Sequence, residues 1–412
     1  MHILLLIIYG LLAGYAIRKM PFLRKSGIRP GWLLFLFAVH VLTGWLHNWI
    51  AWRYFPGHGD IWDYFSKSFL YRHRLFSDWN LFVYGNSTWT YLSHNSIIFI
   101  QMLLDSFSDD NMYINTLIFA FPVFLGNVAL FRVFKRHFAG STFASASVFW
   151  LPSVLFWTSC IYREGMLYLL LGFLFFHLDL LRTPTNPHPR RHLIYAFLLL
   201  ALIAYFRLTV AIILIPTLFI FLSPPRRRRT TIIAISAIFL LTLSIPALRD
   251  PVLHTLSAEQ SLFQVLDGHS RLPLPSMTGT LTSLVQTLPA AIRNGFFEPL
   301  PGSGGQHIYL VFSIELILIW LVTVLAVLAP LRPVTPSIEP PTLSSTATPA
   351  FLFLALAGML AIGLIVPFAG AIVRYRSIYL PFLLAPALHR LRHLSFIQTL
   401  DRLLTNRLKF LI

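Results

Sequence analysis

Apolar runs alternate with short polar segments along almost the whole chain. A helix that crosses a bilayer needs roughly 20 apolar residues, with about 17–25 as the usual range. Eleven runs approach this length, although several are shorter than a full span and the last contains Pro381 and Pro386. The runs cover residues 2–17, 32–53, 113–131, 139–160, 165–181, 192–206, 208–222, 230–247, 307–329, 350–372 and 377–389. The pattern predicts an all-α polytopic membrane protein of about 11 transmembrane helices, with ten spans and an external tail as the alternative.

The basic residues between these runs predict the orientation of the chain. The connections 18–31, 132–137, 182–192 and 224–229 are all basic, as is the tail after the last run. Because basic loops stay on the cytoplasmic side, alternation of eleven spans places the N-terminus outside. Most acidic residues then fall on the outer side. The first run is followed, not preceded, by basic residues, so we expect a retained span and not a cleaved signal peptide.

The lengths of the connections predict the domain organisation. Residues 1–393 are expected to form one transmembrane domain with two long external loops, 54–112 and 248–306. Aromatic residues in the first loop are typical of helices that lie in the membrane interface. The Pro-rich stretch 330–349 predicts a cytoplasmic linker, and residues 394–412 predict an amphipathic cytoplasmic tail.

Composition supports the membrane assignment. The chain is 56% hydrophobic and 11% charged, with a mean hydropathy of +0.70, whereas soluble domains carry about 25% charged residues. The net charge of +17 does not indicate a nucleic-acid partner, because the basic residues lie in clusters between apolar runs. The single cysteine, Cys160, excludes an internal disulfide. Walker, zincin, nucleophile-elbow and dinucleotide motifs do not occur, which argues against ATP-driven or NAD chemistry.

The first external loop holds a candidate general base. Asp60, Asp63 and Tyr64 fall at i, i+3 and i+4, so they share one face if a helix begins there. Asp60 and Asp63 are candidate catalytic residues, and Asp60 is the ligand if a divalent metal takes part. Tyr64 and, later in the loop, His94 are candidate sugar-binding residues. The alternatives are that Asp60 only caps the helix, that Asp63 is an ordinary solvated carboxylate, and that the aromatic residues form an interfacial belt.

Arginines at the outer ends of predicted spans form a second candidate group: Arg163, Arg207, Arg374 and Arg376. Ionisable groups at membrane depth are costly and indicate function by default. A guanidinium binds two phosphate oxygens at once, so these residues are candidate phosphate ligands. Glu164 is a further catalytic candidate, and Tyr375 a further sugar-binding one. Alternatively, the arginines extend to lipid head groups or pair with Glu164. A lone Glu315 within residues 307–329 is either a proton site or a packing group.

Three segments resemble motifs of a known superfamily. They are Gly-Asp-Ile-Trp-Asp-Tyr at 59–64, the Pro-Ser-Val-Leu-Phe-Trp-Thr-Ser stretch within 151–165, and Arg-Tyr-Arg-Ser-Ile-Tyr-Leu-Pro at the start of 374–383. Together they resemble bacterial membrane glycosyltransferases of the GT-C superfamily, and the EpsG-like or O-antigen-polymerase-like proteins near them.

The resemblance implies a glycosyltransferase of the bacterial cytoplasmic membrane. Asp60 would deprotonate an acceptor hydroxyl, and the four arginines would stabilise a polyprenyl phosphate leaving group. The implied partners are a lipid-linked sugar, a glycan, lipid or protein acceptor, and membrane lipids. No cofactor is implied with certainty, and a divalent metal is the candidate. The alternatives are a polymerase of lipid-linked repeat units and a transporter or flippase of lipid-linked sugar.

Overall fold

A computed structural model describes the chain except for residues 56, 58, 78–87, 184–185, 269, 304–307, 330–343 and 412. The described residues form helices, and strand pairing is confined to two isolated antiparallel bridges, Ile28 with Leu411 and Arg271 with Phe368. The prediction of an all-α fold is confirmed.

The helices follow one another along the chain. In order they are α1 (His2–Lys19), α2 (Pro21–Arg24), α3 (Pro30–Tyr54), α4 (Gly59–Ser77), α6 (Thr88–Ser108), α7 (Met112–His137), α8 (Thr142–Ser145), η2 (Ala146–Phe149), α9 (Pro152–Thr158), α10 (Arg163–Leu181), α11 (Pro189–Phe206), α12 (Leu208–Leu222), α13 (Arg228–Ser244), α14 (Pro246–Gln264), α15 (Leu281–Ile292), η3 (Arg293–Phe297), α16 (Ile308–Leu328), α17 (Ser344–Ile365), α18 (Ala369–Ser377), α19 (Leu380–Arg390), α20 (Ser395–Arg402) and η4 (Leu403–Arg407).

Several of these helices can cross a membrane. Within the described part of the chain, seven are long and apolar enough: α1, α3, α7, α10, α11, α16 and α17. An eighth is reached if α13 and α14, which meet at a bend of 89°, count as one span. The remaining expected runs form shorter pieces. Residues 139–160 divide among α8, η2 and α9, and the run 377–389 becomes the 11-residue α19.

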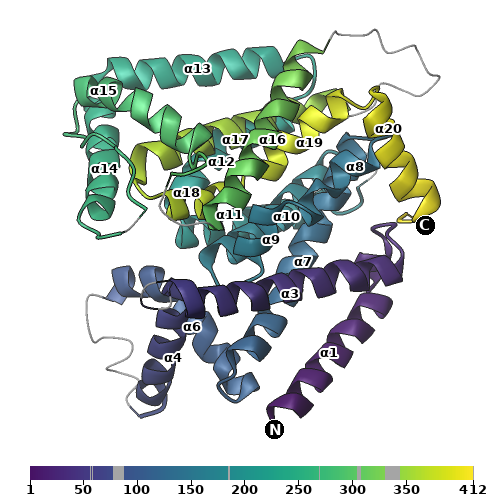
Figure 1. The fold of residues 1–412 in the computed structure, drawn as a ribbon. Helices are drawn as coiled ribbons and strands as arrows, with labels where there is room; N and C mark the ends of the chain where they lie inside the picture. The colour runs from purple at the N-terminus through teal and green to yellow at the C-terminus, as the bar shows by residue number, and fades with distance from the viewer. Residues whose placement is uncertain are drawn as a thin grey trace.

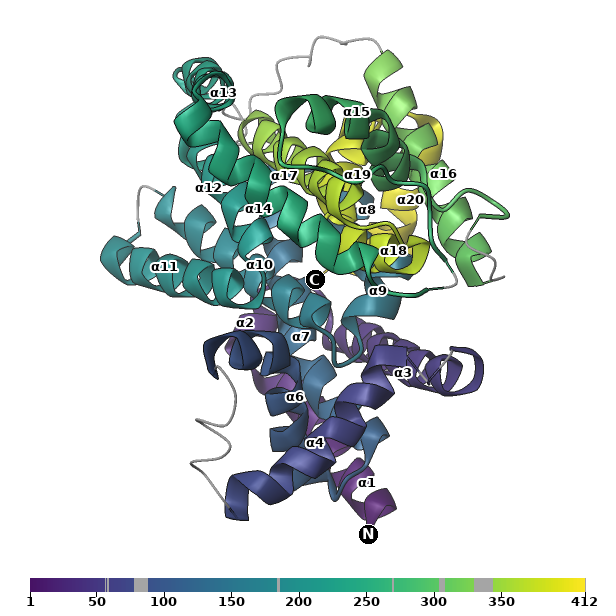
Figure 2. The ribbon, with the colours of Figure 1, turned by 90° about the vertical axis from the view of Figure 1, so that its left-hand side faces the viewer.

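The helices surround a buried central pair, α7 and α10. In Figures 1 and 2, α1, α3, α4 and α6 lie on one side of this pair, and α13 to α19 lie on the other. The backbones of the two helices are in contact where Gly172 of α10 meets Gly126 of α7. There is no room for a side chain at this point, since a Cβ added to Gly172 would lie only 2.2 Å from the carbonyl oxygen of Gly126. Small residues permit this close approach between helices in membranes.

A buried polar network fixes α4 against its neighbours. Asp105 of α6 is 1% exposed and accepts hydrogen bonds from Ser68 of α4 at 2.5 Å, from Gln101 at 2.9 Å and from Asn115 of α7 at 2.5 Å. Nearer the start of α4, the indole of Trp62 donates to the backbone oxygen of Asn48 in α3 at 3.0 Å. These contacts determine where the first turn of α4 lies.

We expect Asp105→Ala to destabilise the protein by more than about 2 kcal/mol, because it leaves the buried amides of Gln101 and Asn115 without their acceptor and each costs about 1–3 kcal/mol. Thermal unfolding in detergent measures the effect. Asp63→Ala is the control, since Asp63 forms an exposed pair with Lys67 and exposed pairs contribute below about 1 kcal/mol. Equal decreases in the stability of Asp105→Ala and Asp63→Ala would contradict a structural role for the network around Asp105.

Candidate active site

A cavity of about 1640 Å³ opens between the two sides of the molecule. Its walls come from α4, α10, α11, α12, α14, α17 and α18, so segments from most of the chain meet there. The wall holds both charged and apolar residues. The charged residues are Asp60, Asp63, Lys67, Arg163, Glu164, Arg207, Glu259, Asp267 and Arg374.

Helix starts and a helix break bring these charges together. Asp60 lies in the first turn of α4, directly after Gly59, whose φ of +71° suits glycine. Arg163 and Glu164 begin α10. Arg207 interrupts the apolar run between α11 and α12 with an extended backbone, φ −160° and ψ 99°. Arg374 belongs to α18. Irregular backbone at membrane depth is tolerated where it lines a cavity.

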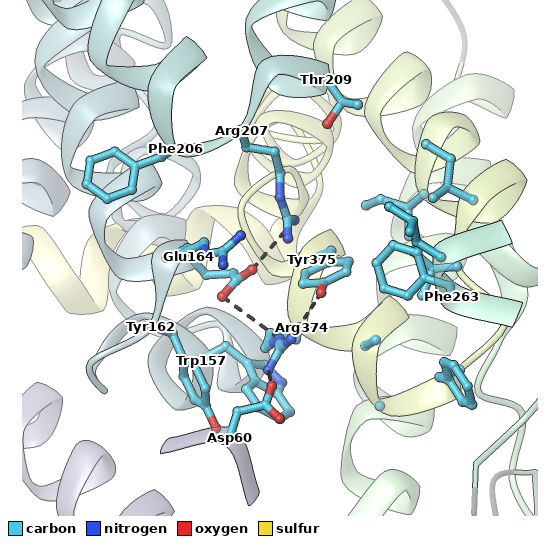
Figure 3. A pocket seen from close by; sticks show the side chains of 18 of the residues that line it. Asp60, Trp157, Tyr162, Glu164, Phe206, Arg207, Thr209, Phe263, Arg374 and Tyr375 are labelled. Carbon is cyan, nitrogen blue, oxygen red and sulfur yellow. Dashed lines mark hydrogen bonds and ion pairs between the residues drawn. The ribbon is translucent and has the colours of Figure 1, made fainter. Parts of the chain in front are cut away.

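The charged side chains form a continuous network, shown in Figure 3. Nη1 of Arg374 donates to Oδ2 of Asp60 at 2.6 Å, and its Nη2 donates to the hydroxyl of Tyr375 at 3.0 Å. Nε of Arg374 lies 3.9 Å from Oε2 of Glu164. The other oxygen of Glu164, Oε1, lies 3.5 Å from Nη1 of Arg207. The order of charges is therefore Asp60, Arg374, Glu164, Arg207.

The two carboxylates differ in their exposure. The Glu164 side chain is 2% exposed, while that of Asp60 is 52% exposed. A buried charge is tolerated only when it is paired, and two arginines supply that pairing for Glu164. Asp60 keeps half of its surface open, so it can meet a substrate group.

Both arginines of the network lie close to the ring of Tyr375. The guanidinium of Arg207 lies over the Tyr375 ring at 3.8 Å from its centroid, and that of Arg374 at 4.9 Å. Arg374 also lies 5.0 Å from the ring centroid of Tyr162. Burial raises the pKa of the Tyr375 hydroxyl, but Arg374 and Arg207 outweigh burial and hold that pKa below its usual value. Attraction between cations and aromatic faces stabilises this stack.

The protonation states follow from the same neighbours. Arg374, mainly through its charge, holds the pKa of Asp60 below its usual value, although burial acts in the opposite direction. Asp60 is therefore ionised at neutral pH. Burial raises the pKa of Tyr64 to about 12, so its hydroxyl stays neutral and can act as a hydrogen-bond donor.

The structure brings most of the predicted site residues together. Eight of them line the cavity: Asp60, Asp63, Tyr64, Arg163, Glu164, Arg207, Arg374 and Tyr375. The carboxylate of Asp63 is half exposed and forms an ion pair with Lys67 at 2.6 Å. His94 lies outside the residues whose side chains the structure describes.

Arg376 does not join the cavity. It follows Arg374 by two residues, which places it on a different face of α18. Its buried guanidinium donates to the backbone oxygens of Gly295 at 3.2 Å and Glu298 at 2.7 Å. The structure therefore places Arg376 as a link to the turn after η3, away from the position expected for a phosphate ligand.

Glu315 of α16 also lies outside the cavity. Its carboxylate accepts hydrogen bonds from the backbone nitrogen of Ser153 at 3.1 Å and from the Ser153 hydroxyl at 3.1 Å. Ser153 belongs to the first turn of α9. This arrangement favours the packing interpretation over the proton-site interpretation.

Sequence reasoning missed several lining residues. Tyr162 directly precedes the Arg163–Glu164 pair and underlies Arg374. Ala201 and Ala204 of α11, and Gly358 and Ala361 of α17, line the apolar part. The signal in the sequence was the pair of small residues spaced three apart on each of these two apolar helices, because small residues mark helix faces that other groups approach closely.

Within the described residues, no three His, Cys, Asp or Glu side chains gather as a metal site.

Comparison with protein-family models, curated proteins and solved structures gives no match. The class that fold and site define is a helical membrane protein whose cavity is lined by paired charges and by apolar residues.

Removing the Arg374 charge should raise the pKa of Asp60. We expect Arg374→Gln to shift the pH midpoint of Asp60 protonation upward, since burial then opposes ionisation without the main cation. Carbodiimide, which modifies the protonated carboxyl, followed by peptide mass spectrometry across pH 3–7 measures the midpoint, with Asp63 as internal control.

The lowered pKa of Asp60 makes the stability of the protein depend on pH. Because the folded-state pKa of Asp60 is depressed, its ion pair stabilises the protein above the usual carboxyl pKa, and this contribution is lost as pH falls. An unchanged midpoint in Arg374→Gln would show that Arg374 does not control the ionisation of Asp60.

Proposed function

We propose that this chain is a glycosyltransferase that uses a polyprenyl-phosphate-linked sugar at the outer face of a bacterial cytoplasmic membrane. The observation that carries the proposal is one cavity in which an arginine–carboxylate network adjoins an apolar wall. A lipid phosphate has the same two-part chemistry, with an anionic head and an apolar chain.

The donor fits the two parts of the cavity separately. Arginine forks are suited to phosphate oxygens, and the guanidinium groups of Arg207 and Arg374 both lie within 5 Å of the centre of the Tyr375 ring. Apolar residues of α11, α12 and α17 line the rest of the cavity, where an apolar chain can lie. A cavity of about 1640 Å³ exceeds the 300–1000 Å³ typical of drug-sized ligands, as a lipid-linked sugar requires.

Asp60 supplies the base in this proposal. Its carboxylate accepts the proton of an acceptor hydroxyl while the acceptor oxygen forms a bond to the anomeric carbon. The bond from that carbon to the phosphate oxygen breaks, and the phosphate leaves with the electron pair. Guanidinium groups stabilise the negative charge that develops on the phosphate. The acceptor is a glycan, a lipid or a protein.

The orientation belongs to the same proposal. Eleven spans with the N-terminus outside would put the first turn of α4 and the start of α10 at the outer surface, where positive-inside bias makes arginines unexpected. Ionisable residues gathered at one cavity support a reaction at one face, in contrast to the midplane sites and repeated halves of transporters. A polymerase of lipid-linked repeat units would use the same chemistry with a longer donor.

We expect Asp60→Asn to lower glycosyl transfer by about 10²–10⁴-fold, the usual contribution of a general base, whereas Asp63→Asn should retain most activity. Purified proteins in liposomes with a pool of polyprenyl-phosphate-linked sugars provide the measurement, and thermal unfolding checks that each variant folds. If wild type makes no product but moves labelled lipid-linked sugar between leaflets, the transporter interpretation replaces this one.

A further inference from the structure

The two carboxylates of the charge network are held in different ways. Glu164 is buried in the first turn of α10, between Arg207 at 3.5 Å and Arg374 at 3.9 Å. Asp60 reaches across from α4 to Arg374 at 2.6 Å and remains half exposed. Glu164 is thus fixed within the helix bundle, whereas Asp60 lies at the cavity surface.

We infer that Glu164 is a positioning residue for Arg207 and Arg374, and that Asp60 occupies, in the substrate-free protein, the place on Arg374 that a substrate phosphate takes. This inference rests on the proposed function, since it assigns roles within the same site. It replaces the expectation that Glu164 is catalytic, because a carboxylate that is 2% exposed has almost no surface with which to touch an acceptor.

The distances around Glu164 fit a positioning role. Charge-assisted hydrogen bonds measure about 2.7–2.9 Å, and both separations from Glu164 are longer. Its Oε1 accepts no hydrogen bond from the described residues. Glu164 therefore offsets the repulsion between two guanidinium groups without using their N–H donors, which leaves those donors for a ligand.

Asp60 is placed to exchange with a phosphate. A guanidinium binds carboxylate and phosphate through the same planar donors, so the Asp60 carboxylate stands in for a phosphate oxygen. A phosphate that takes its place separates Asp60 from the cation that weakens it as a base. The base then becomes effective when the donor is bound, so that the donor binds before the acceptor reacts.

The charge of the network agrees with this exchange. Arg207 and Arg374 carry two positive charges, and Asp60 and Glu164 carry two negative ones. A phosphodiester that takes the place of the Asp60 carboxylate on Arg374 brings one negative charge for the one it displaces, so both arginines remain paired.

The test is the affinity of the full-length protein in nanodiscs for polyprenyl monophosphate, a ligand without a sugar. Asp60→Asn should bind it about 3- to 10-fold more tightly than wild type, because a competing ion pair is removed. Glu164→Gln should bind it at least about 10-fold more weakly, because the arginines lose their common counter-ion. The two variants remove the same charge, so opposite effects cannot come from net charge.

Asp250→Asn is the control that removes one negative charge elsewhere, since Asp250 pairs with its neighbour Arg249 and does not line the cavity. The affinity of this variant for polyprenyl monophosphate should stay within about twofold of wild type. Glu164→Asp, which keeps the charge, should bind more tightly than Glu164→Gln. Weaker binding by Asp60→Asn, or changes of the same sign in both variants, would overturn the inference.

The outcomes for the inference and for the proposed function are distinct. If the variants show the expected affinities but the protein transfers no sugar from any donor, the exchange between Asp60 and phosphate is supported and the proposed glycosyltransferase function is rejected. Failure of wild type and all variants to bind the lipid phosphate would reject both.

Discussion

The ion pair between Arg374 and Asp60 is the contact on which the site depends, because it joins two elements that are 314 residues apart in the chain. A charge removed from water is costly unless a partner compensates it. Arg374 therefore requires a carboxylate nearby, and Glu164 requires a cation. The four charges at Asp60, Arg374, Glu164 and Arg207 satisfy one another only if α4, α10, α18 and the α11–α12 break lie together.

The irregular backbone of the chain serves this arrangement. A continuous helix through residues 189–222 would direct the Arg207 side chain according to helix periodicity alone, whereas the extended conformation at Arg207 turns the side chain toward Glu164. Similarly, α17 ends at Ile365 and α18 begins at Ala369, just after Pro367, since proline cannot continue the hydrogen bonding of a helix. The start of a new helix there brings Arg374 and Tyr375 to the cavity.

Local sequence patterns predicted most of the long helices and several residues of the candidate site, but not the features that depend on contacts between distant segments. Apolar run length identified most of the long helices, and the rarity of arginine at the outer ends of spans pointed to Arg163, Arg207 and Arg374. The same rule also selected Arg376, because residue spacing within α18 does not reveal that its face meets Gly295 and Glu298. Division of residues 139–160 into short pieces was also hidden, since hydropathy does not register the break before Pro152. Tertiary contacts such as the Asp105 network have no signature in one sequence.

The two arginines beside Tyr375 have different roles because of their geometry. Arg207 lies with its guanidinium 3.8 Å above the ring, and such stacking covers a face of the guanidinium while leaving its N–H edge available. Arg374 already donates from that edge to Asp60 and Tyr375. A ligand phosphate can therefore meet Arg207 without displacing a hydrogen bond, whereas it reaches Arg374 only by replacing one. The first contact selects an anion, and the second links its binding to the release of Asp60.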